Sequence, residues 1–547
     1  VPTNADDHTV LIRYDIWDLN EGKVPEFPVE NPPGWDAISL YYAKALQQMG
    51  WLNPSTPVRD VSKTWEYSEK PDSYYFQAAM HWTQRWPNSL PPDPFRQWWN
   101  HCTHGPATAE DYFLAWHRGY IYWFEVIVRS HVTRLGGPAS WALPYWNYSY
   151  HDADDPSGPW PRARLPWVFC QPALPDGSGN PLYVPDTVRR GLQPVWPGET
   201  NTMYLESTTP YYDQAYAATD YFDFNATLDG QPHGVVHVDV GTGDLQVSPT
   251  GWMQSTITAS FDPIFWLHHA EIDRFWVGWL AQGNANPADN SWLSASGDPD
   301  GAWRWNFWRD GDIANKVVVH PGQMLDPGSL ADPFPHSYCY ADLPQVPAPA
   351  VPGKARRAAT MAVDEAPTPR PRLATAAANS GDPVLAATEN VDLGKDPVSV
   401  AVDLPPESRA VFDALTGGPG RPPRVMLHLR GVVADSPPGN YEIYVNYTQA
   451  NRMTAGSAPQ FAGVLPGFGA DHHHGGGDEG HDGSQGHGDH GLSFRYDITD
   501  LVRYLQQSGN WDPARAMVTF VPAARPRPGR DLVMAGMKIG TVMITSE

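Results

Sequence analysis

The sequence predicts a mainly α-helical N-terminal domain with long loops, followed by a β-rich, sandwich- or barrel-like C-terminal domain. Three observations predict this division. A chain of 547 residues is too long for one compact core. Apolar residues recur at helical spacing in the first part, whereas short β-type runs separated by turn residues fill the last part. Between them the composition changes to Pro, Ala, Arg and Thr, which favours a linker. We therefore predict domains at 1–343 and 391–547 and a linker at 344–390.

The N-terminal domain contains three clear helical segments. They span 72–86 and 112–135, and a third begins near Asp262. The third segment keeps helical spacing from His269 to Leu280. The chain also carries 24 Trp and 25 Tyr, many of them in this domain, which predicts a rigid and densely packed helical core.

The C-terminal domain is predicted from short runs rich in β-branched and aromatic residues. One stretch, 498–505, has a helical pattern instead. The predicted strands are 398–404, 425–433, 441–447, 517–521 and 537–544.

Composition excludes several classes of function. The net charge of -24 argues against nucleic-acid binding and against an anionic membrane surface. No apolar run approaches the length that crosses a bilayer, and the polar start at Val1 is not a secretion leader, so we expect a soluble protein. Secreted and cytoplasmic locations both stay open, as does assembly into a homo-oligomer. Three cysteines cannot build a disulfide framework.

A His-rich segment interrupts the C-terminal domain at 471–491, where six His lie among Gly and Asp. We predict a flexible surface loop. Weak, exchangeable metal binding is the alternative, because imidazoles on a mobile chain bind divalent ions without enforcing a geometry. A catalytic role is not expected.

The strongest motif is HGVVH, with His233 and His237, followed by FDPIFWLHHAEIDRFW, with His268 and His269. Two His at i and i+4 lie on one face of a helix, so both imidazoles can reach one ion. A third imidazole from the following helix would complete a three-nitrogen site with open positions. Such a site suits copper or zinc.

A second histidine set lies earlier in the chain, with His81 in AMHWTQRW, His104 in NHCTHG and His117 in FLAWHRGY. Two sets of three, carried by two pairs of helices, predict a four-helix bundle that holds two metal ions face to face. Any single His among them could instead be a structural core residue. Their combination is what indicates a dinuclear centre.

These motifs resemble those of the type-3 copper family, which contains tyrosinases, catechol oxidases (polyphenol oxidases) and molluscan hemocyanins. The resemblance implies two copper ions, one held by His81, His104 and His117, the other by His233, His237 and His269. The family uses the second His of the HH pair, which makes His268 a neighbour of the site rather than a ligand. Four segments of the tail, APQFAGVL, ITDLVRYL, MVTFVP and MAGMKIG, resemble the C-terminal domain of plant polyphenol oxidases.

Further family features follow from the resemblance. Cys102 precedes His104 by two residues, as in relatives where the sulfur is bonded to the imidazole, so a Cys102–His104 thioether is expected; a free buried thiol is the alternative. Tyr338-Cys339-Tyr340 resembles the family's Tyr-x-Tyr motif, and Arg13 is expected to pair with it. The position of the family's gate phenylalanine is occupied by Thr256.

The resemblance implies an oxidoreductase that uses O2 to convert o-diphenols to o-quinones, with weaker monophenol hydroxylation (monooxygenase activity). In relatives, an acidic residue and an Asn around the first His of the second set hold a water that deprotonates monophenols. Here these positions are Asp229 and Gly234, so one partner of that water is missing. Val238 is expected to line the entrance to the site.

Two other functions stay open at this stage. A hemocyanin-like reversible O2 carrier would use the same copper site without substrate access. A zinc hydrolase would need a general base beside the histidine pair, where HGVVH has glycine. In latent relatives the C-terminal domain covers the site until the linker is cut. Whether it does so in this chain stays open at this stage.

Overall fold

A computed structural model provides the structure of the protein. It describes residues 9–51, 70–81, 112–150, 162–183, 212–241, 251–256, 258–289, 292–293, 305–343, 372–373, 384–417, 423–451, 454, 458–472, 491–523 and 534–546. The chain divides into two compact units. The first is Val1–Thr103, Tyr112–Tyr204 and Thr256–Thr360, and the second is His104–Asp111, Leu205–Ser255 and Met361–Glu547.

The first unit is mainly helical, as predicted. Its helices are α1 (Ile16–Asn20), α2 (Ala37–Gln48), α3 (Tyr74–Ala79), α4 (Phe113–Arg134) and α8 (Ile264–Ala281). Its strands are β1 (Val10–Arg13) with β4 (Ser337–Tyr340), paired in parallel, and β2 (Trp305–Trp308) with β3 (Lys316–Val319), paired antiparallel. The predicted helices at 112–135 and from about 262 are confirmed.

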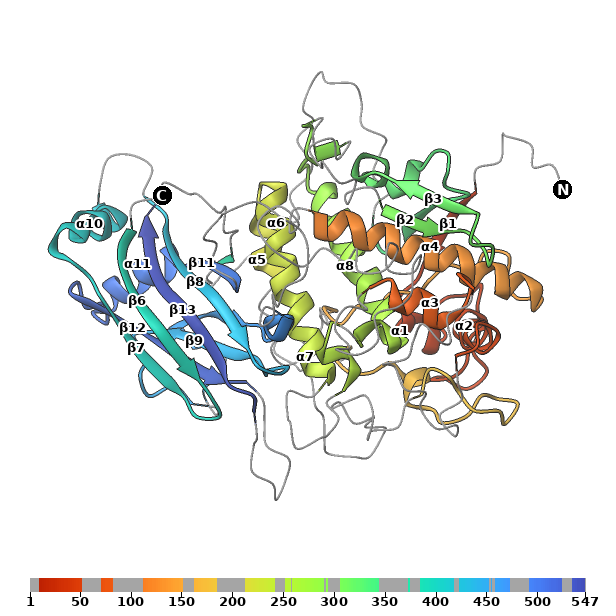
Figure 1. Cartoon of the computed structure of the whole chain (residues 1–547), viewed down its shortest axis with the longest axis horizontal. Helices are drawn as coiled ribbons and strands as arrows, with labels where there is room; N and C mark the ends of the chain where they lie inside the picture. The colour runs from red at the N-terminus through yellow and green to blue at the C-terminus, as the bar shows by residue number, and fades with distance from the viewer. Residues whose placement is uncertain are drawn as a thin grey trace, which may run out of the picture. The chain divides into compact units, whose positions relative to one another are not determined.

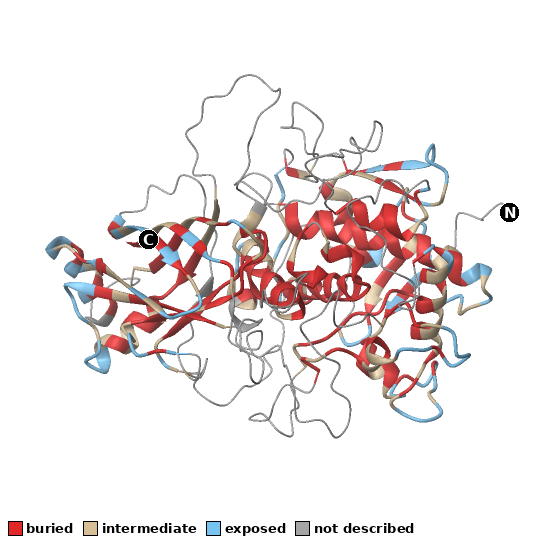
Figure 2. Cartoon of the chain, turned by 60° about the horizontal axis from the view of Figure 1, so that its bottom comes forward, coloured by how far each residue is buried: buried red, intermediate tan, exposed pale blue. Residues whose placement is uncertain are grey.

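Helices α4 and α8 pack against each other and form the centre of the first unit (Figure 1). Aromatic rings pack between the two helices: those of Phe124 and Trp266 stack with centroids 3.5 Å apart and an interplanar angle of 7°. Both helices are buried around nearly their whole circumference (Figure 2). A helix buried on all sides has to pair every charged side chain that it carries.

The second unit is rich in β-structure, as predicted. Its helices are α5 (Tyr212–Ala217), α6 (Tyr221–Leu228), α7 (Val235–Gly241), α10 (Arg409–Gly417) and α11 (Thr499–Gln507). Its strands are β5 (Arg372–Leu373), β6 (Val384–Leu393), β7 (Val398–Asp403), β8 (Val425–Ala434), β9 (Tyr441–Val445), β10 (Phe461–Leu465), β11 (Leu492–Asp497), β12 (Arg515–Pro522) and β13 (Met537–Ser546).

Two sheets organise these strands. One has the order β10-β9-β12-β7 and the other β5-β11-β8-β13-β6, with every pairing antiparallel (Figure 1). Side chains of both sheets join in one hydrophobic core, for example Ile443 of β9, Leu427 of β8 and Ile539 of β13. All five predicted strands and the helix at 498–505 are present.

The boundaries differ from the prediction in two places. Strand β6 begins at Val384, inside the predicted linker 344–390, because its apolar residues pair with β13. Residues 205–255, predicted as part of the first domain, belong to the second unit. The physical reason is long-range packing, since Val235 of α7 is buried among Tyr444 of β9 and Val464 of β10.

Candidate metal centre

In the first unit, three buried imidazoles lie together. His81 follows α3, His117 lies in the first turns of α4, and His269 lies on α8. Their candidate ligand nitrogens all lie within 4.8 Å of one another. The rings of His117 and His269 are nearly parallel, with centroids 4.3 Å apart and an interplanar angle of 10°. The structure thus gathers members of both predicted histidine sets around one point.

Neighbouring backbone fixes the orientation of two of these rings. Nδ1 of His81 lies 2.9 Å from the carbonyl oxygen of Thr256, and Nδ1 of His117 lies 2.8 Å from that of Phe113, four residues earlier in the chain. A carbonyl oxygen can only accept, so each Nδ1 donates its proton and Nε2 carries the lone pair. This is the tautomer that a metal ligand needs, with the second ring nitrogen held by a hydrogen bond.

In the second unit, His233 and His237 are fully buried side by side, with ring centroids 4.5 Å apart. His233 ends the turn Asp229–Gly234, and His237 lies on α7. Nδ1 of His237 donates to the carbonyl of Met253 at 2.8 Å, and Nδ1 of His233 donates to that of Asp229 at 2.9 Å. The same argument leaves Nε2 of both rings as the ligand atom. The donor chemistry of all four oriented rings therefore fits copper.

The residues predicted to tune the site are placed as follows. The carboxylate of Asp229 lies 3.1 Å from Nδ1 of His233, so it orients that ring. His268 points differently from His269, with ring planes 69° apart, and its ring lies near Tyr148. Val238 is buried. His104 and Cys102 lie outside the described residues, so the thioether stays a prediction.

One residue missed at the level of sequence covers the histidine pair. The ring of Phe468 stacks on that of His237, with centroids 3.9 Å apart and an interplanar angle of 15°, and meets the ring of His233 edge-on at 5.5 Å. A Cβ built on Gly234 would lie 3.1 Å from Cβ of Pro466. The segment that carries Phe468 therefore rests against the turn that carries His233. The available signal was an aromatic residue between two glycines, Gly467 and Gly469.

A buried charge network holds α4 and α8 together. Arg13 donates to Glu125 of α4 at 2.9 Å and to Asp273 of α8 at 3.3 Å. It also donates to Tyr340 at 3.0 Å, and its guanidinium lies 3.6 Å from the centroid of the Tyr338 ring. The predicted pairing of Arg13 with the Tyr-x-Tyr motif is confirmed. Glu125 and Asp273 were not predicted, since an acidic residue on a helix gives no local sign of burial.

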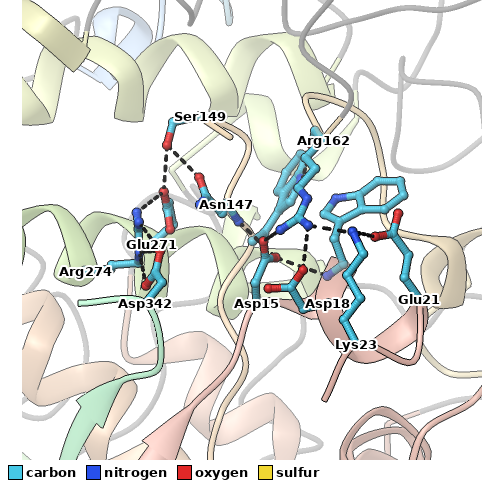
Figure 3. A network of polar contacts seen from close by, with 12 residues as sticks. Asp15, Asp18, Glu21, Lys23, Asn147, Ser149, Arg162, Glu271, Arg274 and Asp342 are labelled. Atoms are coloured by element: carbon cyan, nitrogen blue, oxygen red, sulfur yellow. Dashed lines mark hydrogen bonds and ion pairs between the residues drawn. The ribbon is translucent and has the colours of Figure 1, made fainter. Parts of the chain in front are cut away.

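A second network fastens α8 next to His269. Figure 3 shows Arg274 between Glu271 and Asp342, with Ser149 and Asn147 beside Glu271. Arg274 donates to Glu271 at 3.0 Å and to Asp342 at 2.9 Å. Burial raises the pKa of Glu271 well above its ordinary value. These contacts tie the middle of α8 to the residues that follow β4.

The comparisons with known proteins find a tyrosinase domain in the part of the chain that carries these histidines. Residues 71–282 match the common central domain of tyrosinase, and residues 381–546 match a domain of unknown function, DUF7868. Over 511 residues the chain is 26% identical to tyrosinase HcTyr1 of Hahella sp. (strain CCB-MM4), which covers 90% of this chain and 93% of that protein. It is 33% identical over 206 residues to the chloroplastic polyphenol oxidase of Vitis vinifera, which covers 34% of this chain and 31% of that protein.

The fold is also shared with a solved structure. The structure of latent apple tyrosinase aligns with a TM-score of 0.51 at 20% identity, covering 100% of this chain and 98% of that one. Among the described residues, no helix combines the length and the hydrophobicity needed to cross a membrane. The tyrosinase domain, the relative matched over most of both chains and the buried imidazoles agree: the chain is an oxidoreductase similar to tyrosinases and polyphenol oxidases, with a pair of copper ions as its cofactor.

Proposed function

We propose that the chain is a polyphenol oxidase that oxidises o-diphenols to o-quinones with O2 and hydroxylates monophenols more weakly. The observation that carries this proposal is the group formed by His81, His117 and His269, buried and confined within 4.8 Å. Imidazoles with Nδ1 held by carbonyl oxygens are preorganised ligands for a redox metal. The finer architecture, a four-helix bundle followed by a β-sandwich, belongs to the same proposal.

The proposed ligands are those that the family resemblance implies. One copper ion would be held by His81, His104 and His117, and the other by His233, His237 and His269, with a Cys102–His104 thioether fixing one ring. When bound, the copper pair supplies the redox chemistry with O2. O-diphenol gives up two electrons and two protons to become the o-quinone, and each O2 accepts four electrons and four protons to give two waters.

The chain's own residues hold the rings still and keep water away. Phe265 lies between two ligands, with ring centroids 4.2 Å from His269 and 4.8 Å from His81. Phe113 packs on His117 at 4.6 Å. A dry aromatic shell strengthens electrostatic interactions inside it and excludes side reactions. Orientation and exclusion of water are therefore the contribution of the protein to the reaction.

The preference for diphenols rests on Asp229 and Gly234. The Asp229 carboxylate is engaged with Nδ1 of His233, and Gly234 offers no side-chain amide. A water placed there to deprotonate a monophenol would have fewer hydrogen-bond partners than in relatives with Asn. O-diphenols lose their protons more readily and depend less on this water, so their oxidation is expected to be faster.

The test measures copper per chain together with turnover of a catechol and of its monophenol, with the lag phase removed. We expect two copper ions, rapid quinone formation from catechol and a slower monophenol rate. His237→Ala is expected to lower catechol turnover at least about 100-fold, because a ligand is lost. His320→Gln is the matched control and is expected to keep it.

Four outcomes would contradict the proposal. Binding of a single ion, or a preference for zinc, would remove the dinuclear copper site. Reversible O2 uptake with two copper ions and no catechol consumption would indicate a carrier instead. Equal initial rates on catechol and monophenol would defeat the proposed diphenol preference.

A further inference from the structure

We propose that the C-terminal β-region is a permanent support for the helix that carries the histidine pair His233 and His237, and that Asn440 is the positioning residue of this support. The inference rests on the proposed function, because it assigns these histidines to a copper ion. It concerns how the second half of the metal site is held in place. It predicts that the C-terminal region stays seated after the linker has been cut.

The first observation is the burial of α7 in the second unit. Val235 lies two residues before His237, and its side chain is fully buried. It belongs to a hydrophobic cluster formed with residues of β9, β10 and β12 and of nearby loops. The members of this cluster are Val235, Tyr444, Ala450, Phe461, Val464 and Val521. Removing the C-terminal strands would expose this face of α7 to water.

The second observation concerns the amides on both sides of the histidine pair. Gln231, two residues before His233, is fully buried, and its Nε2 donates to the carbonyl of Val464 in β10. Nε2 of Gln254 donates to the carbonyls of Pro437 and Pro438, each at 3.1 Å. Gln254 directly follows Met253, whose carbonyl holds the ring of His237. Both rings therefore lie next to residues anchored in the C-terminal region.

Asn440 joins these contacts at one buried side chain. Its Nδ2 donates to the carbonyl of Val235 at 3.3 Å and to the carboxylate of Asp239 at 3.2 Å, both on α7. Its Oδ1 accepts from the backbone N–H of Gly467 at 3.1 Å. Gly467 precedes Phe468, the residue that stacks on His237. One amide group therefore positions α7 and the covering segment relative to each other.

The backbone leaves little freedom for this arrangement to shift. A Cβ built on Gly467 would lie 2.5 Å from the carbonyl oxygen of Pro438. A Cβ built on Gly241, at the end of α7, would lie 2.3 Å from Cβ of Gln254. Only glycine allows such close approaches. They hold Gly467 against Pro438 and the end of α7 against Gln254. Partners that hold a ligand's orientation typically change metal affinity about 10–100-fold when they are removed.

Substitutions can distinguish the donor role of Asn440 Nδ2 from the acceptor role of its Oδ1. Asn440→Asp keeps an acceptor for the Gly467 N–H but cannot donate to Val235, and it places a second carboxylate beside Asp239. Asn440→Ala removes both functions. The matched control is Asn446→Gly, which deletes another amide that ties strands of this region but does not touch α7. Glycine also suits the positive φ of 54° at Asn446.

The experiment measures amide hydrogen exchange of residues 229–241 in the metal-free protein and release of copper to a chelator from the loaded protein. We expect both Asn440 variants to exchange faster in this segment and to release one of the two ions on the order of tenfold faster. KM for catechol is expected to fall in Asn440→Ala, because the segment that carries Phe468 loses its acceptor for the Gly467 N–H. It is expected to stay at the wild-type value in Asn440→Asp, which keeps that acceptor. Asn446→Gly is expected to match the unmodified chain in hydrogen exchange, copper release and KM.

A site-specific protease sequence placed at 354–357 completes the test. After cleavage, we expect the two pieces to elute together and to keep two copper ions. Separation of the pieces with both ions left on the N-terminal piece would overturn the proposal, as would Asn440 variants that match the unmodified chain. A purified protein that never binds two copper ions would instead defeat the proposed function, so the two failures are distinguishable.

Discussion

Gly234 lies in a tightly packed place beside the proposed metal ligand His233. The family resemblance implies an Asn amide at this position, and the chain here lacks that amide. The space at this position is tight, since a Cβ would lie 3.1 Å from Cβ of Pro466 and 3.5 Å from Cβ of Phe468. A side chain at position 234 would therefore press on the covering segment, which would have to move by a few tenths of an ångström. The weaker monophenol hydroxylation that we propose is thus linked to the presence of this cover.

Phe468 gives a prediction at the same scale. Phe468→Ala removes the ring from His237, and we expect KM for catechol to fall about tenfold, because a larger fraction of molecules becomes accessible. The substitution should also destabilise the protein by about 3 kcal/mol, since a buried aromatic ring is lost. Steady-state kinetics and denaturant unfolding check the two effects.

The control for Phe468→Ala is Phe494→Ala. Phe494 packs against the core of the C-terminal sheets. Its removal should cost stability and leave KM for catechol unchanged. A KM for Phe468→Ala that equals that of the unmodified chain would show that this ring does not limit access.

At the scale of elements, the contact between α4 and α8 depends on buried charge. Burial by itself would raise the pKa of Glu125, but the charge of Arg13 and the hydrogen bond from His336 outweigh it and lower that pKa to about 2. Burial also lowers the pKa of His336, although Glu125 opposes this. The two helices that carry His117 and His269 are therefore held together by a carboxylate that has to stay ionised.

The lowered pKa of Glu125 predicts acid sensitivity. The folded state holds the carboxylate ionised more strongly than the unfolded state, whose pKa is near 4.5. The resulting stabilisation is fully present above about pH 4.5 and is lost as the pH falls toward 2. A shift of this size corresponds to about 3 kcal/mol. Urea unfolding at pH 5 and at pH 2.5 measures this difference.

Two variants separate this contribution from those of other acidic groups. Glu125→Gln should lose several kcal/mol at pH 7, because Arg13 keeps its charge in a buried position without one of its partners. It should also be less sensitive to pH between 5 and 2.5. Glu389→Gln, on the exposed side of β6, should behave as the unmodified chain. Equal pH dependence in all three proteins would rule out Glu125 as the cause.

The sequence predicts local elements better than it predicts their partners. Helices α4 and α8 follow from apolar spacing, and the pairing of Arg13 with Tyr340 follows from family resemblance. Strands β10 and β11 were missed, because glycines and the His-rich segment 471–491 weaken their pattern. The contacts of Gln231 with Val464 and of Asn440 with Val235 could not be predicted, because partners more than 200 residues apart leave no local pattern.

At the scale of the whole molecule, we expect two classes of copper site that differ in affinity. Two ions are expected to bind tightly at the buried histidines and to raise the unfolding temperature in proportion to the logarithm of copper concentration. Further copper is expected to bind weakly to the His-rich segment 471–491. Replacing its six His with Asn should abolish the weak binding and leave two tight ions, as measured by equilibrium dialysis. A fall below two tight ions would place part of the catalytic copper on this segment.

The burial of α7 among strands of the C-terminal region has a consequence for biosynthesis. A ribosome completes His237 long before it completes Asn440, Val464 and Val521, which surround the helix in the folded protein. During that interval the C-terminal strands that bury Val235 do not yet exist. On the proposed assignment of His233 and His237 to one copper ion, we expect that ion to bind stably only after the strands that bury Val235 have been made.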